Sequence, residues 1–174
     1  VQLQLDPQLW GEMNRRVTLQ GQFLHDHTVF LDNRTYQGRA GFWVFTPLQL
    51  DAHSTVLVQR GWVARDMRDT QAVPELPASP DPVQLQGRLT TTPSHWLDLQ
   101  SSESSTQSGS SPIRHNIDLT QLKQDWGMQI LGVVLQTDPS DAKLVRDWPL
   151  PASTAGTNQG YAFQWFAMCL TIFV

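Results

Sequence analysis

The segment His25–His27 places two histidines with one residue between them, a spacing that occurs in metal sites. On a strand, both imidazoles would point to the same face and could bind one zinc or copper ion. A complete site needs three or four ligands. The remaining histidines lie apart in polar segments without ligand spacing: His53, His95 and His115. We therefore expect no metal site, and interpret the pair as solvent-facing histidines at the start of a strand.

Side chains that could catalyse hydrolysis lack the settings that this chemistry needs. A serine nucleophile needs a positioned base and a strained turn such as Gly-x-Ser-x-Gly, and the sequence contains no such turn. The carboxylates of Asp66, Asp69 and Glu75 lie in expected loops without apolar neighbours to raise a pKa. No glycine-rich phosphate loop opens a helix. The sequence therefore predicts a protein that is not an enzyme.

Two groups of residues favour recognition instead, Asp32–Arg34 and Arg60–Trp62. If they lie at adjacent strand ends, Asp32, Asn33, Arg34, Arg60 and Trp62 form one rim with two guanidinium groups and an aromatic ring. Such a rim could bind a partner protein or a haem propionate. The alternative is structural: Asp and Asn form an Asx-turn, Arg34 or Arg60 pairs with Asp32, and Trp62 belongs to the core.

Composition limits the possible classes of protein. The 174 residues are enough for one domain with a core, and only 16% of them are charged. The net charge of -4, without a basic stripe, argues against nucleic-acid binding. Cys169 is the only cysteine, which excludes an internal disulfide, a thiolate zinc site and a Cys-x-x-Cys-His haem attachment. The chain begins at Val1 without a signal peptide, so we interpret it as a fragment of a longer protein.

The candidate rim must be positioned by strands. Residues 17–23 alternate apolar and polar, residues 28–31 are rich in β-branched and aromatic side chains, and residues 42–46 and 55–63 continue the pattern. We expect turn chemistry at residues 32–41 and the end of a ladder at Pro47. These segments predict a meander of antiparallel strands.

Further strands and two short helices complete the expected fold. Strands are predicted at residues 83–89 and 129–136, and helices after Asp6–Pro7 and from Asp118 to Gly127. The closely spaced prolines of residues 74–82 favour an extended connector. Seven of the twelve residues 100–111 are serines, so we expect a disordered loop there. The fold class is mainly β with minor α, a small antiparallel barrel or strongly curled sheet.

The last fourteen residues, Tyr161–Val174, contain no charged side chain. As a helix they would rise about 21 Å, less than the ~30 Å of a hydrocarbon core. They are either a buried terminal helix or the first part of a membrane helix, and Tyr161 and Trp165 suit an interfacial aromatic belt.

Six blocks distributed along the chain resemble one protein family. They are LDNRT at 31–35, GRAG at 38–41, TPL at 46–48, VQRGWV at 58–63, LVRDWP at 144–149 and GYAFQWF at 160–166. Their order and spacing are similar to the signature blocks of the surfeit locus protein 1 (Shy) family of cytochrome c oxidase assembly factors. Two positions depart from the family: Gln59 stands where Asn is usual, and Asn158 where His is common.

The resemblance implies a domain between two membrane helices. Residues 1–157 would be an exported domain, and residues 158–174 the start of the second helix. The protein would be integral to a bacterial inner membrane or the mitochondrial inner membrane, with its domain on the periplasmic or intermembrane-space side. Its expected partners are the oxidase catalytic subunit, other oxidase assembly factors and the membrane.

The resemblance also implies a role in haem a delivery or insertion. The family's haem-handling segment corresponds to Asn158, Tyr161, Gln164 and Trp165. An Asn amide is a poor ligand for haem iron, whereas imidazole is a good one. The last three residues could instead hydrogen-bond or pack against a porphyrin rim, or anchor the chain at the interface. The alternative function is a membrane-tethered scaffold that binds oxidase subunits without binding haem.

Overall fold

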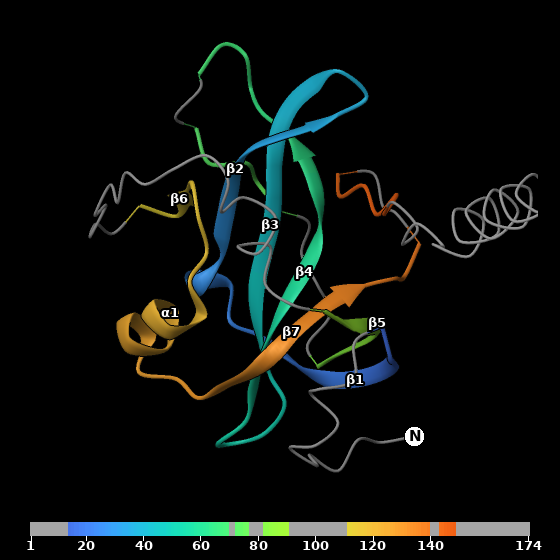
Figure 1. The fold of residues 1–174 in the computed structure, drawn as a ribbon, viewed down its shortest axis with the longest axis vertical. Helices are drawn as coiled ribbons and strands as arrows, with labels where there is room; N and C mark the ends of the chain where they lie inside the picture. Colours follow the sequence, from blue (N-terminus) through green and yellow to red (C-terminus); the bar gives the residue numbers. More distant parts are fainter. Residues whose placement is uncertain (1–13, 70–71, 77–81, 91–110, 140–142, 149–174) are drawn as a thin grey trace, which may run out of the picture.

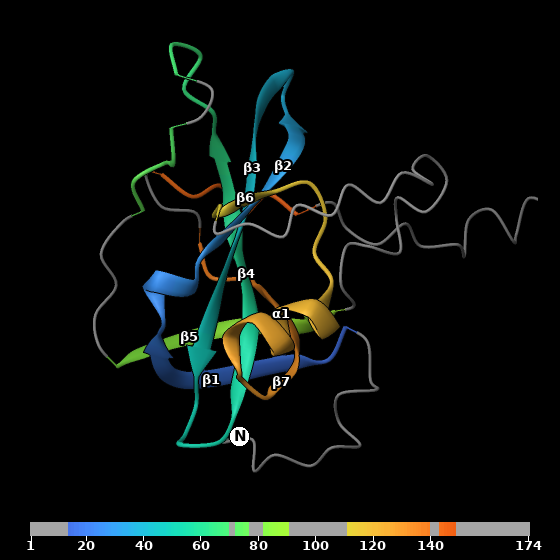
Figure 2. The same cartoon turned by 90° about the vertical axis from the view of Figure 1, so that its left-hand side faces the viewer.

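A computed structural model describes residues 14–69, 72–76, 82–90, 111–139 and 143–148. Its centre is a closed barrel of five strands, drawn in Figures 1 and 2. Around the ring, each strand pairs with the next in the order β1 (Arg16–Phe23), β5 (Val83–Thr90), β7 (Ile130–Gln136), β4 (Thr55–Ala64) and β3 (Arg39–Gln49). The ring closes because the end of β3 pairs with the end of β1.

The closing seam between β1 and β3 is short. It has two residue pairs, Gln22 with Gln49 and Phe23 with Leu48. A Cβ atom at Gly21 would collide with the Gln49 carbonyl oxygen and lie 3.2 Å from Leu48 Cγ. A residue without a side chain is therefore required where the two strands approach.

Strand β2 (Val29–Tyr36) continues the sheet beyond the barrel and forms a hairpin with β3. The two-residue β6 (Ile113–Arg114) pairs in parallel with β2, and β2 follows the short 3-10 helix η2 (His25–His27). The β2–β3 hairpin extends away from the barrel body at the top of Figure 1. This projecting sheet positions the residues 32–34.

Helix α1 (Leu119–Trp126) begins and ends where the sequence predicts. The Asp118 carboxylate accepts the Thr120 N–H at 2.7 Å, and Gly127 ends the helix in the left-handed conformation with φ 61°. Leu122 is fully buried. It belongs to a core cluster shared with strands β2, β3, β4 and β7.

Two further clusters of buried side chains complete the core. One, inside the barrel, joins β1, β5 and β7 to the ends of β3 and β4. The other joins β2, β3 and β4 to Leu144, which is fully buried. Alternating apolar residues in β1 and β5 supply the barrel side, because successive strand residues face opposite sides.

Most of the predicted strands are confirmed, and the fold is mainly β. Two expectations are wrong. Pro47 does not end its ladder: β3 continues to Gln49, and the Pro47 carbonyl accepts the Leu24 N–H at 2.9 Å. The turn is narrower than residues 32–41, because β2 runs to Tyr36. The sheet is mostly antiparallel, with parallel pairing between β4 and β7 and between β2 and β6.

Three predictions lie outside the described residues: the helix after Asp6–Pro7, the serine-rich loop up to residue 110, and the segment 158–174. Within the described residues, no helix has the length and apolar character to cross a membrane.

The closing seam gives a test of barrel stability. Gly21→Ala should lower the free energy of unfolding by about 1–3 kcal/mol, because the new methyl group meets backbone that cannot move freely. Urea unfolding followed by tryptophan fluorescence measures this loss. Gly38→Asn is the control: Gly38 has φ +75° with no atom within 4 Å of a Cβ, and Asn tolerates that conformation, so a change within about 0.5 kcal/mol is expected. Equal losses in both variants would show that the seam is not tightly packed.

Candidate functional site

The candidate rim begins at a β-bulge in β2. Leu31 pairs with Trp43, but Arg34 pairs with Gly41, so Asp32 and Asn33 together face one residue of β3. Asn33 has φ 58°, and its N–H donates to Asp32 Oδ1 at 2.5 Å. This bond comes from the adjacent residue and not from the residue two positions on, so the predicted Asx-turn is wrong.

The Asp32 carboxylate is held by a cation that sequence reasoning missed. Arg65 Nη2 donates to Asp32 Oδ1, and the Arg65 guanidinium lies 4.6 Å from the centre of the Phe42 ring. The expected ion pair from Arg34 or Arg60 is therefore wrong. Arg65 directly follows β4, and its N–H donates to Ala40 at 3.1 Å, which brings it beside the bulge across β3. The strand register, which the sequence does not reveal, is the missing signal.

The surroundings of Asp32 stabilise its charged form. Burial acts to raise the pKa of Asp32, but the hydrogen bonds from Arg65 and the Asn33 N–H, with the charges of Arg65 and His115, lower it below the ordinary 3.8. The His115 Nδ1 atom is 3.8 Å from Asp32 Oδ2. A carboxylate held in this way is not available as a general base.

Arg34 lies on the same side of the sheet as Trp43. Its guanidinium carbon is 5.0 Å from the centre of the Trp43 ring. Its backbone carbonyl accepts the Trp62 indole N–H at 2.9 Å. Burial lowers the pKa of Arg34, and the charge of Asp32 offsets part of that effect.

Arg60 and Trp62 are buried and not displayed at the surface, although the Trp62 indole lies beside the Arg34 backbone. Arg60 is 3% exposed and Trp62 is 5% exposed. The expected rim that displays both arginines is therefore wrong for Arg60 and Trp62. Arg60 lies at a second bulge, and its guanidinium is 4.5 Å from the centre of the Phe23 ring. Trp62 packs over Gly41, where a Cβ atom would be 2.5 Å from the indole. The structural interpretation of Trp62 as a core residue is confirmed.

The segment 143–148 completes this side of the sheet. Val145 and Trp62 exchange backbone hydrogen bonds of 2.8 Å, which adds the segment to the edge of β4. The Tyr36 hydroxyl donates to Asp147 Oδ2 at 2.9 Å, an interaction that raises the pKa of Tyr36. Trp148 lies edge-on to Trp43, with ring centres 6.4 Å apart. Trp43 therefore lies beside Arg34, Tyr36 lies beside Trp62, and Trp148 lies beside Trp43; we call this surface the Arg34 face.

The histidines His25 and His27 lie in η2 and not on a strand, so the expected shared face is wrong. The His27 ring packs edge-on against Trp126, with centres 5.5 Å apart. Among the described residues, no three His, Cys, Asp or Glu side chains gather as a metal site would require.

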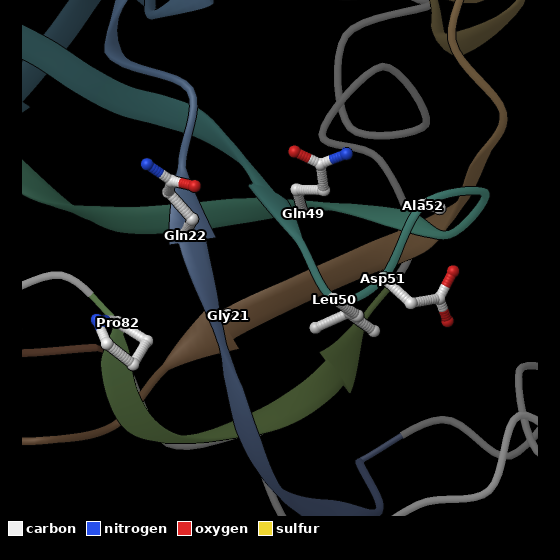
Figure 3. Close-up of a pocket in the computed structure, with 7 residues that line it drawn as sticks. All are labelled: Gly21, Gln22, Gln49, Leu50, Asp51, Ala52 and Pro82. Carbon is white, nitrogen blue, oxygen red and sulfur yellow. The ribbon is translucent and has the colours of Figure 1, made fainter.

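A shallow hollow of about 490 Å³ lies at the other end of β3, beside the closing seam (Figure 3). It is lined by Gly21, Gln22, Gln49, Leu50, Asp51, Ala52 and Pro82. Its one carboxylate, Asp51, accepts the backbone N–H of His53 at 2.8 Å, and this bond lowers the pKa of Asp51. The lining supplies no converging set of acid, base and nucleophile, so the Arg34 face is the better candidate for recognition.

Fold and site together define a small β-barrel domain whose notable surface chemistry is an arginine among aromatic rings. The SURF1 family model matches residues 2–170, so the chain belongs to the SURF1 family. A cytochrome oxidase assembly protein of Saccharomyces cerevisiae, SHY1, is 38% identical over 53 residues. That match covers 30% of this chain and 14% of the yeast protein.

Two other relatives extend the comparison. A SURF1-like protein of Dictyostelium discoideum is 33% identical over 69 residues, covering 37% of this chain and 26% of that protein. An uncharacterized SURF1-like protein of Mycobacterium bovis is 29% identical over 166 residues, covering 88% of this chain and 55% of that protein. The chain thus spans about half the length of this mycobacterial relative, and less of the other two.

The predicted haem-handling residues lie outside the described residues, and their roles stay predictions: Asn158, Tyr161, Gln164 and Trp165.

The Asp32–Arg65 pair gives a pH-dependent prediction. Asp32→Asn should lower the free energy of unfolding at pH 7 by about 1–2 kcal/mol, between the values typical of exposed pairs and of buried charged hydrogen bonds. The folded state lowers the pKa of Asp32, so the ion pair stabilises the fold fully at pH values above the pKa that Asp32 has in the unfolded chain. This stabilisation is lost as the pH falls through the lower pKa that Asp32 has in the folded chain. Urea unfolding at several pH values should show the gap to the native sequence closing below about pH 4.

Asp125→Asn is the matched control for this measurement. Asp125 pairs with Arg114 at 3.2 Å, but its side chain is 41% exposed, so the expected loss is about 0.5 kcal/mol or less. A gap for Asp32→Asn that stays constant with pH would contradict the assigned ion pair.

Proposed function

We propose that this chain is the globular part of a cytochrome oxidase assembly factor that acts by binding other molecules and not by turning over a substrate. The observation that carries the proposal is the family match over residues 2–170, together with the name of the yeast relative, a cytochrome oxidase assembly protein. The order of the six sequence blocks supports the same assignment.

The geometry of the Arg34 face supports recognition over catalysis. The neighbouring carboxylate of Asp32, which the β2 bulge places on the other side of the sheet, is bonded to Arg65 and Asn33, and Tyr36 is bonded to Asp147. What this face offers outward is a guanidinium beside aromatic rings, a combination that is enriched in protein interfaces.

We further propose that the protein assists the delivery or insertion of haem a into the oxidase catalytic subunit. The segment containing Asn158, Tyr161, Gln164 and Trp165 would pack against or hydrogen-bond the porphyrin. Because an Asn amide is a poor iron ligand, this segment would hold haem by its rim, or a residue elsewhere would supply the axial ligand. The domain would lie on the periplasmic or intermembrane-space side of an inner membrane, held there by residues 158–174.

A scaffold that binds oxidase subunits without haem is the second candidate. Asn158, at the position where the resembled family commonly has His, favours it. Under this proposal the Arg34 face is the main functional surface, and the C-terminal segment serves only as an anchor.

Deleting the gene that encodes this chain should reduce assembled cytochrome oxidase several-fold. If the protein delivers haem a, the catalytic subunit should remain but lack haem a; if it is a scaffold, the association of subunits should fail first. Difference spectra of membranes and native gels of oxidase subunits measure these outcomes. The amounts of b-type and c-type haem proteins are the internal control, and an unchanged oxidase level would contradict the proposed function.

A haem titration distinguishes the two candidates directly. If a residue elsewhere supplies the axial ligand, the membrane-intact protein should show a Soret shift typical of ligation that survives Asn158→Ala and is lost on changing that ligand. If the segment holds haem only by its rim, a saturable Soret change without the signature of ligation is expected. A scaffold should show neither change.

A further inference from the structure

The Arg34 guanidinium is a half-buried cation that lacks a polar partner in the part of the chain that the structure describes. Its Nε atom is enclosed and makes no hydrogen bond there. The face of Trp43 lies 5.0 Å away and stabilises the charge without satisfying its donors. An incoming acceptor cannot reach the enclosed Nε, but the terminal Nη atoms of the same guanidinium are not enclosed and remain able to donate to it.

The nearest carboxylate does not fill this role. Asp32 Oδ1 accepts from Arg65 and from the Asn33 N–H, and Asp32 Oδ2 is 3.8 Å from His115. Arg34 therefore adds a positive charge to a cluster whose one carboxylate is already bonded. This local excess, on a chain of net charge -4, is complementary to an anion with planar geometry.

The Trp43 ring borders the cation, and the Trp148 ring borders Trp43. The Trp148 indole N–H donates to the Gln136 carbonyl at 2.7 Å, which orients that ring edge-on to Trp43 at 6.4 Å. The Trp43 side chain makes no hydrogen bond within the described residues, so its indole N–H is a second donor near Arg34. Partly exposed rings in this arrangement suit contact with another flat apolar group.

We propose that Arg34, Trp43 and Trp148 form a subsite for a peptide segment of a partner protein in which an acidic side chain is followed by an aromatic one. The carboxylate would accept from the Arg34 guanidinium, and the aromatic ring would pack beside the two indoles. The partner's identity as an oxidase subunit or another assembly factor rests on the proposed function. The peptide-binding chemistry does not.

An acidic peptide fits this face better than an anionic membrane. Anionic lipid surfaces are typically held by clusters of basic residues, whereas this subsite has the single cation Arg34. A planar guanidinium over one indole, with a second indole beside that ring, instead matches one carboxylate with an adjacent ring.

The test uses two peptides with capped ends, Gly-Glu-Phe-Gly and its twin Gly-Gln-Phe-Gly, titrated into the 174-residue chain and followed by nitrogen-15 NMR. The Glu peptide should shift the Arg34 Nε–H and Trp43 indole N–H signals. The Gln peptide should bind about tenfold more weakly, because it lacks the charge that pairs with Arg34.

Substitutions assign the effect to Arg34. Arg34→Ala should abolish the preference for Glu over Gln, and Arg34→Lys should reduce it several-fold, because Lys keeps the charge but not the planar fork. Arg39→Ala removes the same charge from an exposed position on the same hairpin and should leave binding unchanged. Backbone amide spectra and urea midpoints establish that each variant is folded, and Arg34→Lys is the informative variant if the alanine variant unfolds.

Three results would overturn the inference: equal affinity for the two peptides, equal losses in Arg34→Ala and Arg39→Ala, or displacement of the Glu peptide by vesicles of phosphatidylglycerol but not of phosphatidylcholine. No oxidase is present in this measurement. Equal binding of the two peptides would therefore say nothing about the role in oxidase assembly. Likewise, an unchanged oxidase level in the deletion strain would say nothing about peptide binding to Arg34.

Discussion

The close approach of β1 to β3 is the constraint on which the rest of the fold depends. Two residue pairs close the ring, and only a residue without a side chain fits at Gly21. Closure encloses the barrel core and leaves neither β1 nor β3 with an open edge at the seam. It also fixes where β3 goes next, because the same strand that seals the barrel at Gln49 begins at Arg39, in the projecting hairpin. One strand thus serves the core at one end and the recognition face at the other.

Two bulges turn this regular sheet into a site. In β2, the extra residue at Asp32–Asn33 changes which residues face Trp43, so that Arg34 lies on the ring while Asp32 reaches Arg65. In β4, the residue at the bulge is itself an arginine, Arg60, and its side chain is buried against Phe23. The β2 bulge separates Asp32 from Arg34, two side chains that simple alternation would place on one face.

These bulges also mark the limit of what the sequence could predict. The alternation of β1 and β5, the caps at Asp118 and Gly127, and the buried strand β7 follow from local chemistry, and all were predicted. The pairing of Asp32 with Arg65 depends on the register of three strands, which no local pattern contains. The local sequence pattern also does not distinguish Arg34 from Arg60. In the structure, Arg34 is partly exposed, whereas Arg60 is buried. The predicted end of the ladder at Pro47 was wrong because the sheet uses the Pro47 carbonyl, which accepts the Leu24 N–H beside the seam, and does not need an N–H at this position.

The segment 143–148 connects the recognition face to the C-terminal part of the chain. Leu144 is fully buried, Val145 pairs with Trp62, and Trp148 contacts Trp43, so this segment is bound to β3 and β4 at successive positions. Gly61, with φ +153°, is needed for this contact, because a Cβ there would lie 3.1 Å from Leu144 Cβ. The next residues lead to the segment predicted to contact haem and membrane. Among the described residues, Trp148 is the one nearest in sequence to that segment, and it is also part of the proposed peptide subsite.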